Sequence, residues 1–156
     1  MDRTDRLEAI EAIRDLKARY FRLLDTRRWE ELAALFTADM QVLTPEGSIY
    51  AESGQAYADS LRQSLQNAVS CHQGLTAEIE IIEAGDPVNI SARAVWAMQD
   101  EVEWDDAHPR FGWKSIVGRG HYHETYRRED GIWRIATLML TRLRLDMTFP
   151  DSKDPA

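Results

Sequence analysis

Residues 120–135 read GHYHETYRREDGIWRI, and this stretch decides the fold. Polar and apolar residues alternate on both sides of Glu129-Asp130-Gly131. A short polar, glycine-containing segment between two alternating segments is typical of a hairpin turn. The sequence therefore predicts two long antiparallel strands, at 114–128 and 133–145.

Two more segments with the period of a strand precede this hairpin. Residues 75–81 and 90–98 each place apolar side chains at every second position. Gly85-Asp86-Pro87 between them is a predicted turn. Residues 100–112 are polar, and we expect them to form a loop. Together these segments extend the hairpin into an antiparallel meander of four strands.

The N-terminal half has the period of helices instead, because its apolar residues recur at every third or fourth position. The predicted elements are, in chain order, a long helix over 5–24, a short helix over 29–36, short strands at 40–43 and 48–51, and a third helix capped by Ser53. Helices that pack on one face of a curved sheet form an α+β architecture. The space between the two layers is the usual place for a small apolar ligand.

Length and composition restrict the function classes. With 156 residues, of which 44% are hydrophobic and 29% charged, we expect one globular domain over 1–149 and a loose tail over 150–156. The net charge of -8 repels phosphate backbones, so no nucleic-acid partner is expected. No apolar run approaches the roughly 20 residues of a membrane helix, and residues 1–6 lack the apolar run of a signal peptide. We expect a cytoplasmic protein without a membrane partner.

The chain resembles the SnoaL-like branch of the NTF2-like superfamily over about residues 5–144. The segments that carry the resemblance are 19–25 (RYFRLLD), 29–39 (WEELAALFTAD), 71–74 (CHQG) and 120–135. The resemblance implies a cone-shaped α+β barrel, in which three N-terminal helices pack on a curved, mainly antiparallel sheet. We expect a homodimer that covers the exposed face of this sheet.

The resemblance also implies an acid/base site. Dehydratases and dehydrochlorinases of the superfamily use an Asp after the first helix and a His at the start of the third strand, and Asp25 and His72 occupy the matching positions. Tyr20 matches a tyrosine of bile-acid dehydratase and the oxyanion-binding tyrosine of ketosteroid isomerase. The isomerase base has no counterpart, because Thr44 stands at its place. A polar residue that assists in some relatives falls near 96–99.

These matches imply a cofactor-independent lyase of the dehydratase type, without a metal. His72 would be the base, Asp25 would hold it, and Tyr20 would donate a hydrogen bond to a substrate oxygen. The expected substrate is small, apolar, and cyclic or polyketide-like. An isomerase or cyclase with the same pocket, and a binding protein without turnover, are the two alternatives.

Taken without the resemblance, the same residues allow structural interpretations. Asp25 can cap a helix, and the dipole at a helix C-terminus would raise its pKa. His72 can be a structural or surface histidine. His121 and His123 share one strand face, which fits either a solvent or dimer face or, less simply, a metal site. Cys71, the single cysteine, is expected in the core and excludes an internal disulfide.

The expected pocket wall is mostly aromatic. The residues assigned to it are Phe21, Tyr50, Tyr57, Trp96, Met98 and Glu124. Glu124 lies between two tyrosines on the strand face opposite His121. It is either a pocket residue or a hydrogen-bonded structural group.

Overall fold

The computed structural model describes residues 1–83 and 90–151. The predicted turn Gly85-Asp86-Pro87 and most of the predicted tail lie outside the described residues. The elements in chain order are α1 (Arg3–Asp25), α2 (Trp29–Ala33), β1 (Phe36–Leu43), β2 (Ile49–Ala51), α3 (Gly54–Ser64), β3 (Ala68–Glu83), β4 (Ile90–Trp104), β5 (Ser115–Glu129) and β6 (Ile132–Thr148). Within the described part, no helix is both long enough and apolar enough to cross a membrane.

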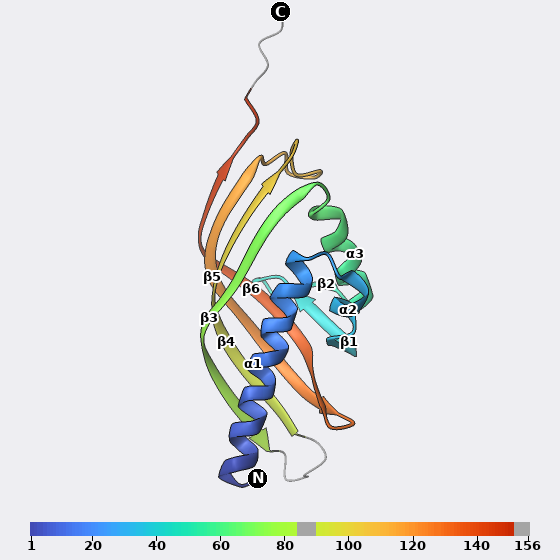
Figure 1. Cartoon of the computed structure of the whole chain (residues 1–156), viewed down its shortest axis with the longest axis vertical. Helices are drawn as coiled ribbons and strands as arrows, with labels where there is room; N and C mark the ends of the chain where they lie inside the picture. The colour runs from blue at the N-terminus through green and yellow to red at the C-terminus, as the bar shows by residue number, and fades with distance from the viewer. Residues whose placement is uncertain (84–89, 152–156) are drawn as a thin grey trace, which may run out of the picture.

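The six strands form one curved sheet in the order β2-β1-β6-β5-β4-β3. All neighbouring strands are antiparallel except β1 and β6, which are parallel. In Figure 1 the long helix α1 runs along one side of this sheet, and α2 and α3 lie beside one end of it. This arrangement confirms the predicted α+β fold, with helices packed on a mainly antiparallel sheet.

The local sequence explains where the two longer helices begin. Asp2 and Asp5 form a capping box at the start of α1, in which each side chain accepts from the backbone N–H of the other residue. Ser53 Oγ accepts from the N–H of Ala56 (3.1 Å) and caps α3, as predicted. The apolar stripe of α1 includes Ile13 and Leu16, which are buried against the sheet.

Several strands are longer than predicted. The helix predicted over 29–36 is wrong at its end: α2 stops at Ala33 and β1 begins at Phe36 instead of residue 40, because Phe36 pairs with Ile135 of β6. β6 itself runs from Ile132 to Thr148 instead of over 133–145.

β3 begins at Ala68 instead of residue 75, and β4 continues to Trp104, through residues expected to form a loop. The two extensions pair with each other, from Ala68–Trp104 to His72–Asp100. The prediction was wrong here because Asp100 and its neighbours read as polar, whereas Asp100 is buried and Glu101 is exposed, as strand alternation requires. The register of β3 with β4 shifts after Gly74, which marks a bulge in β3.

The core contains a buried ion pair between α1 and the sheet. Lys17 Nζ donates to Glu124 Oε1 (2.5 Å), and neither side chain is exposed. The hydroxyl of Tyr126 also donates to Glu124 and accepts from Trp96 Nε1 (2.9 Å). The ammonium lies against three aromatic rings as well. Glu124 is therefore a hydrogen-bonded structural group.

Candidate active site

Asp25 and His72 meet where the end of α1 crosses the start of β3. His72 Nδ1 lies 2.7 Å from Asp25 Oδ1, and the backbone N–H of His72 donates to Asp25 Oδ2 (2.8 Å). The carboxylate thus contacts the histidine through both its ring and its main chain. Since Asp25 and His72 are far apart in sequence, it is the tertiary fold that brings them together, and not the local structure of either element.

Two neighbours hold the carboxylate in place. Ser70 Oγ donates to Asp25 Oδ1 (2.8 Å), and Arg27 Nη1 donates to Ser70 Oγ (2.9 Å). Arg27 has a positive φ of 62° and also donates to the carbonyl oxygen of Ala68. These bonds tie the turn after α1 to the first residues of β3.

The pKa of Asp25 follows from these contacts. Burial would raise it, but the hydrogen bonds from the His72 ring, from the His72 backbone and from Ser70 outweigh burial and lower the pKa. The pKa increase expected from the helix dipole is therefore wrong. Asp25 also caps no neighbouring helix, since α2 follows Arg28 without a side-chain cap.

The carboxylate determines the tautomer of His72. An ionised carboxylate only accepts hydrogen bonds, so Nδ1 of His72 carries the proton that points to Asp25. The neutral ring then has its lone pair on Nε2. This is the state that a general base requires.

His72 lines a cavity of about 180 Å³ between the helices and the sheet. The wall consists of aliphatic and aromatic side chains interrupted by a few polar ones, which is typical of a small-molecule site. The polar and ionisable groups of this wall are Tyr20, Tyr57, Ser64, His72, Asp100, His108, Tyr122 and Arg142.

Tyr20 and Tyr57 form a pair of hydroxyls in this wall, with a distance of 3.0 Å between the two oxygens. Burial raises the pKa of Tyr20 well above its usual value and raises that of Tyr57 to about 12. Both hydroxyls therefore keep their protons near neutral pH. One of them donates to the other, which leaves a proton for a ligand.

Asp100 and Arg142 are further charged residues of the cavity wall, which the sequence analysis did not assign to it. Asp100 is the register partner of His72 on β4. Its carboxylate accepts two bonds from Arg142, at 2.8 Å from Nη1 and 2.7 Å from Nη2. Asp100 continues the inward-facing series of Trp96 and Met98 by one more alternation, and this signal was available in the sequence. Arg144, by contrast, is exposed and pairs with Asp146.

Of the six residues assigned to the pocket wall, Tyr57 lines this cavity and the others lie elsewhere. Phe21 and Trp96 line a separate hollow between α1 and the bulge of β3. Met98 is packed in the core, and Glu124 is bound to Lys17. Tyr50 is exposed, with its hydroxyl at Ser60, because β2 lies at the edge of the sheet.

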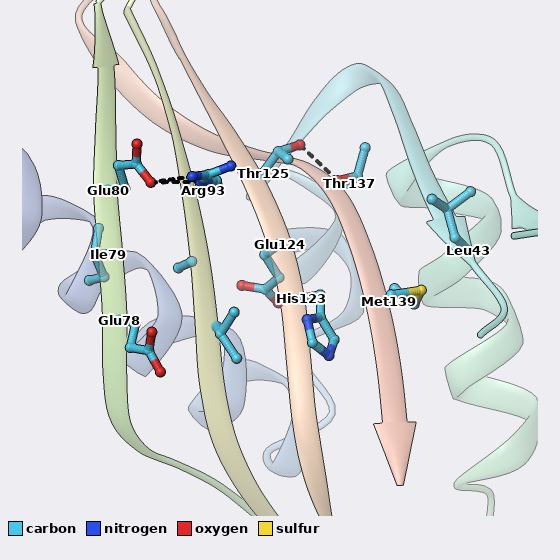
Figure 2. A pocket seen from close by; sticks show the side chains of 12 residues that line it. Leu43, Glu78, Ile79, Glu80, Arg93, His123, Glu124, Thr125, Thr137 and Met139 are labelled. Atoms are coloured by element: carbon cyan, nitrogen blue, oxygen red, sulfur yellow. Dashed lines mark hydrogen bonds and ion pairs between the residues drawn. The ribbon is translucent and has the colours of Figure 1, made fainter.

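A larger hollow of about 480 Å³ lies on the opposite face of the sheet. Figure 2 shows this face, with the strands in front of α1 and the side chains of His123, Thr125 and Met139 on it. His121 and His123 both belong to this face, and the described residues contain no group of three metal ligands. Cys71 is exposed, so its predicted place in the core is wrong.

The fold defines a class of protein. Helices packed on one face of a curved, mainly antiparallel sheet, with a cavity between the two layers, are the arrangement of the NTF2-like superfamily. The model of the SnoaL-like domain matches residues 5–139. The chain belongs to the SnoaL-like family.

Several solved structures share this fold. Hexachlorocyclohexane dehydrochlorinase LinA type 2 is 18% identical, with 99% of this chain and 98% of that chain covered and a TM-score of 0.76. LinA-type3 from Novosphingobium barchaimii is 18% identical, with 99% and 100% covered and a TM-score of 0.69. A scytalone dehydratase candidate from Novosphingobium aromaticivorans is 20% identical, with 97% and 99% covered and a TM-score of 0.65. At these identities the likeness concerns the fold.

Proposed function

We propose that the protein is a cofactor-independent lyase of the dehydratase type, which acts on a small, apolar, cyclic or polyketide-like substrate. The observation that carries the proposal is His72, which lines the cavity and is held from behind by the carboxylate of Asp25. The similar structures include two dehydrochlorinases and a dehydratase candidate, which supports a reaction that removes a proton and a leaving group.

In the proposed reaction, His72 Nε2 takes a proton from the carbon beside a substrate carbonyl. The electron pair of that C–H bond forms the new C=C bond, and the C–O bond to the hydroxyl group breaks. The departing oxygen receives the proton held by His72, so water leaves and the base is restored. Asp25 stabilises the imidazolium that exists between the two transfers.

Tyr20 and Arg142 supply hydrogen bonds to oxygen atoms of the substrate. The protonated hydroxyl of Tyr20 would donate to the carbonyl oxygen as negative charge develops on it. Arg142 uses two of its five N–H groups on Asp100, which leaves others for the leaving oxygen or the carbonyl. Asp100 would hold the guanidinium in position.

The size of the cavity supports a small substrate. A cavity of about 150 Å³ lined by apolar side chains is large enough for benzene. The cavity of about 180 Å³ therefore fits a compound with one ring and a few substituents. Its apolar wall favours a ring with few charged groups.

A β-hydroxy ketone of this size tests the reaction. We expect the protein to convert 3-hydroxycyclohexanone to cyclohexenone and water, followed by the absorbance of the enone and by mass. Asp25→Asn and His72→Ala should each lower the rate about a hundredfold or more, and the double variant little further, because the two residues act as a unit. Tyr20→Phe should lower the rate about tenfold to a thousandfold.

The same experiment separates the alternatives when it is run in D₂O. Deuterium at the α-carbon without loss of water would indicate an isomerase or cyclase. Binding with neither exchange nor elimination would indicate a binding protein. His123→Ala, on the opposite face of the sheet, is the matched control and should keep its activity.

A further inference from the structure

The loop between β4 and β5 holds a buried histidine, His108, whose ring is held on one side by the backbone. His108 Nδ1 accepts from the N–H of Arg110 (3.0 Å) and from that of Phe111 (3.1 Å). The His108 backbone N–H donates to the carbonyl oxygen of Trp113 (2.7 Å), which closes the loop on itself. The ring is therefore part of the hydrogen-bonded framework of the loop.

Aromatic side chains hold the same ring on its other sides. The centroid of the His108 ring lies 5.1 Å from that of Trp104, 4.9 Å from that of Phe111 and 5.4 Å from that of Trp113. Lys114 Nζ donates to the carbonyl oxygens of Trp104 (2.6 Å) and Asp105 (2.7 Å) and so anchors the base of the loop. These contacts hold the His108 imidazole in a single orientation.

The contacts also determine which nitrogen carries the proton. A backbone N–H can only donate, so Nδ1 of His108 accepts both bonds with its lone pair and is unprotonated. The proton of the neutral ring is then on Nε2. Burial lowers the pKa of His108, which favours the neutral form. Among the described residues, Nε2 of His108 has no hydrogen-bond partner.

His108 and His72 line the same cavity in opposite tautomers. His72 carries its proton on Nδ1 and offers a lone pair at Nε2, whereas His108 offers an N–H at Nε2. The two histidines lie at different positions along β4. His72 pairs with Asp100 of β4, and Asp100 is about 13 Å along the strand from Trp104. The loop that contains His108 follows Trp104. The cavity thus has an acceptor at one level and a neutral donor at another.

We propose that His108 is a ligand-orienting donor, whose Nε2–H binds an accepting oxygen of the ligand at the loop end of the cavity. The substrate class that fits is a ring compound with an oxygen acceptor at the end away from the reacting C–H bond. A bare hydrocarbon or halocarbon would leave this donor unpaired, which costs binding energy. The inference rests on the proposed function for the place of the reacting carbon.

The test compares the binding of acetophenone with that of ethylbenzene, which has a similar shape but no oxygen. We expect acetophenone to bind more tightly and to shift the ¹⁵N resonance of His108 Nε2, and ethylbenzene to leave this resonance in place. The ligand-free spectrum should show the proton on Nε2. Equal affinities, no binding of acetophenone, or a proton on Nδ1 would overturn the proposal.

Two variants separate the donor from the structural role of the ring. His108→Asn keeps an oxygen acceptor for the amides of Arg110 and Phe111 but loses the donor, so the preference for acetophenone should fall several-fold, up to about tenfold. His108→Gln keeps a donor near Nε2 and should retain the preference while its melting temperature falls. If the ring had a purely structural role, His108→Asn would retain the preference for acetophenone better than His108→Gln. His123→Asn should leave the preference unchanged.

These measurements need no turnover. Failure to eliminate water from 3-hydroxycyclohexanone would therefore count against the proposed lyase and leave the result on His108 standing.

Discussion

Gly118 on β5 lies directly against Arg142 on β6. A Cβ atom at residue 118 would be 1.9 Å from Arg142 Nη1 and 2.2 Å from Asp100 Oδ1. Non-bonded atoms do not approach so closely, so the glycine leaves the space that the Asp100–Arg142 pair fills. The guanidinium is the end of a flexible side chain, and a new methyl group would displace it while the strands stay in place.

Gly118→Ala should therefore act as a mutation of Arg142. We expect the rate of elimination to fall about tenfold to a hundredfold, because a donor to developing charge is withdrawn. Arg142→Met should have a similar effect, and the double variant should lose little more than either single variant. Steady-state kinetics measures these rates, and melting temperatures show whether each variant is folded. Full activity of folded Gly118→Ala would show that the pair has no part in the reaction.

The lowered pKa of Asp25 predicts an acid-dependent contribution to stability. A carboxyl group whose pKa is lower in the folded state stabilises that state above its ordinary pKa of 3.8, and this stabilisation is lost as the pH falls through the lower folded value. Wild type and Asp25→Asn should thus differ most near neutral pH and converge as the pH falls below about 4. Urea unfolding at a series of pH values measures the difference. A constant difference at every pH would contradict the prediction.

The buried pair of Lys17 and Glu124 predicts a large and asymmetric effect on stability. Lys17→Met leaves the Glu124 carboxylate buried without its partner and should cost about 3–5 kcal/mol in the free energy of unfolding. Adding Glu124→Gln should recover part of this loss, because no uncompensated charge remains. Arg93→Met, which breaks the exposed pair with Glu80, is the control and should change stability little. Equal effects of Lys17→Met and Arg93→Met would refute this account.

The exposed face of the sheet is the expected surface of a homodimer. Val95 lies on this face, on β4 between β3 and β5, in the wall of the hollow shown in Figure 2. We expect a dimer by sedimentation, which Val95→Glu should convert to a monomer by placing two buried charges at the contact. Leu7→Glu, at an exposed apolar position of α1, should remain dimeric. A wild-type protein that is monomeric at all concentrations would remove the prediction.

The periodicity of the sequence was sufficient to predict the elements, because helices and strands bury different sets of positions. It failed at residues 100–104, where a carboxylate interrupts an apolar strand face. Asp100 is tolerated there because Arg142 pairs with it, and a partner so distant along the chain leaves no mark on the local pattern. β3 was expected to begin at residue 75 rather than Ala68 because its first residues do not alternate in the usual way: the apolar Val69 is exposed and the polar Ser70 is buried.

The site was predictable only in part. The resemblance indicated Asp25 and His72, and the structure brings them within hydrogen-bond distance. It could not show which inward-facing aromatic residues reach the cavity, since facing inward does not distinguish the cavity from the packed core. Trp96 illustrates this, because its indole N–H is used by Tyr126. The tautomer of His108 depends on the conformation of its loop, and a loop conformation cannot be predicted from the periodicity of the sequence.

The parallel pairing of β1 with β6 means that the sheet can be completed only when the last strand of the chain is present. β1 leaves the ribosome early, but its long partner is the last strand of the chain, and contacts of such high sequence separation form slowly. A nascent chain that stops before β6 already contains Asp25, His72 and His108, yet it lacks Arg142 and the strand that joins the two halves of the sheet. The proposed activity is therefore expected only after β6 has been added, and truncated translation products should be inert rather than partly active.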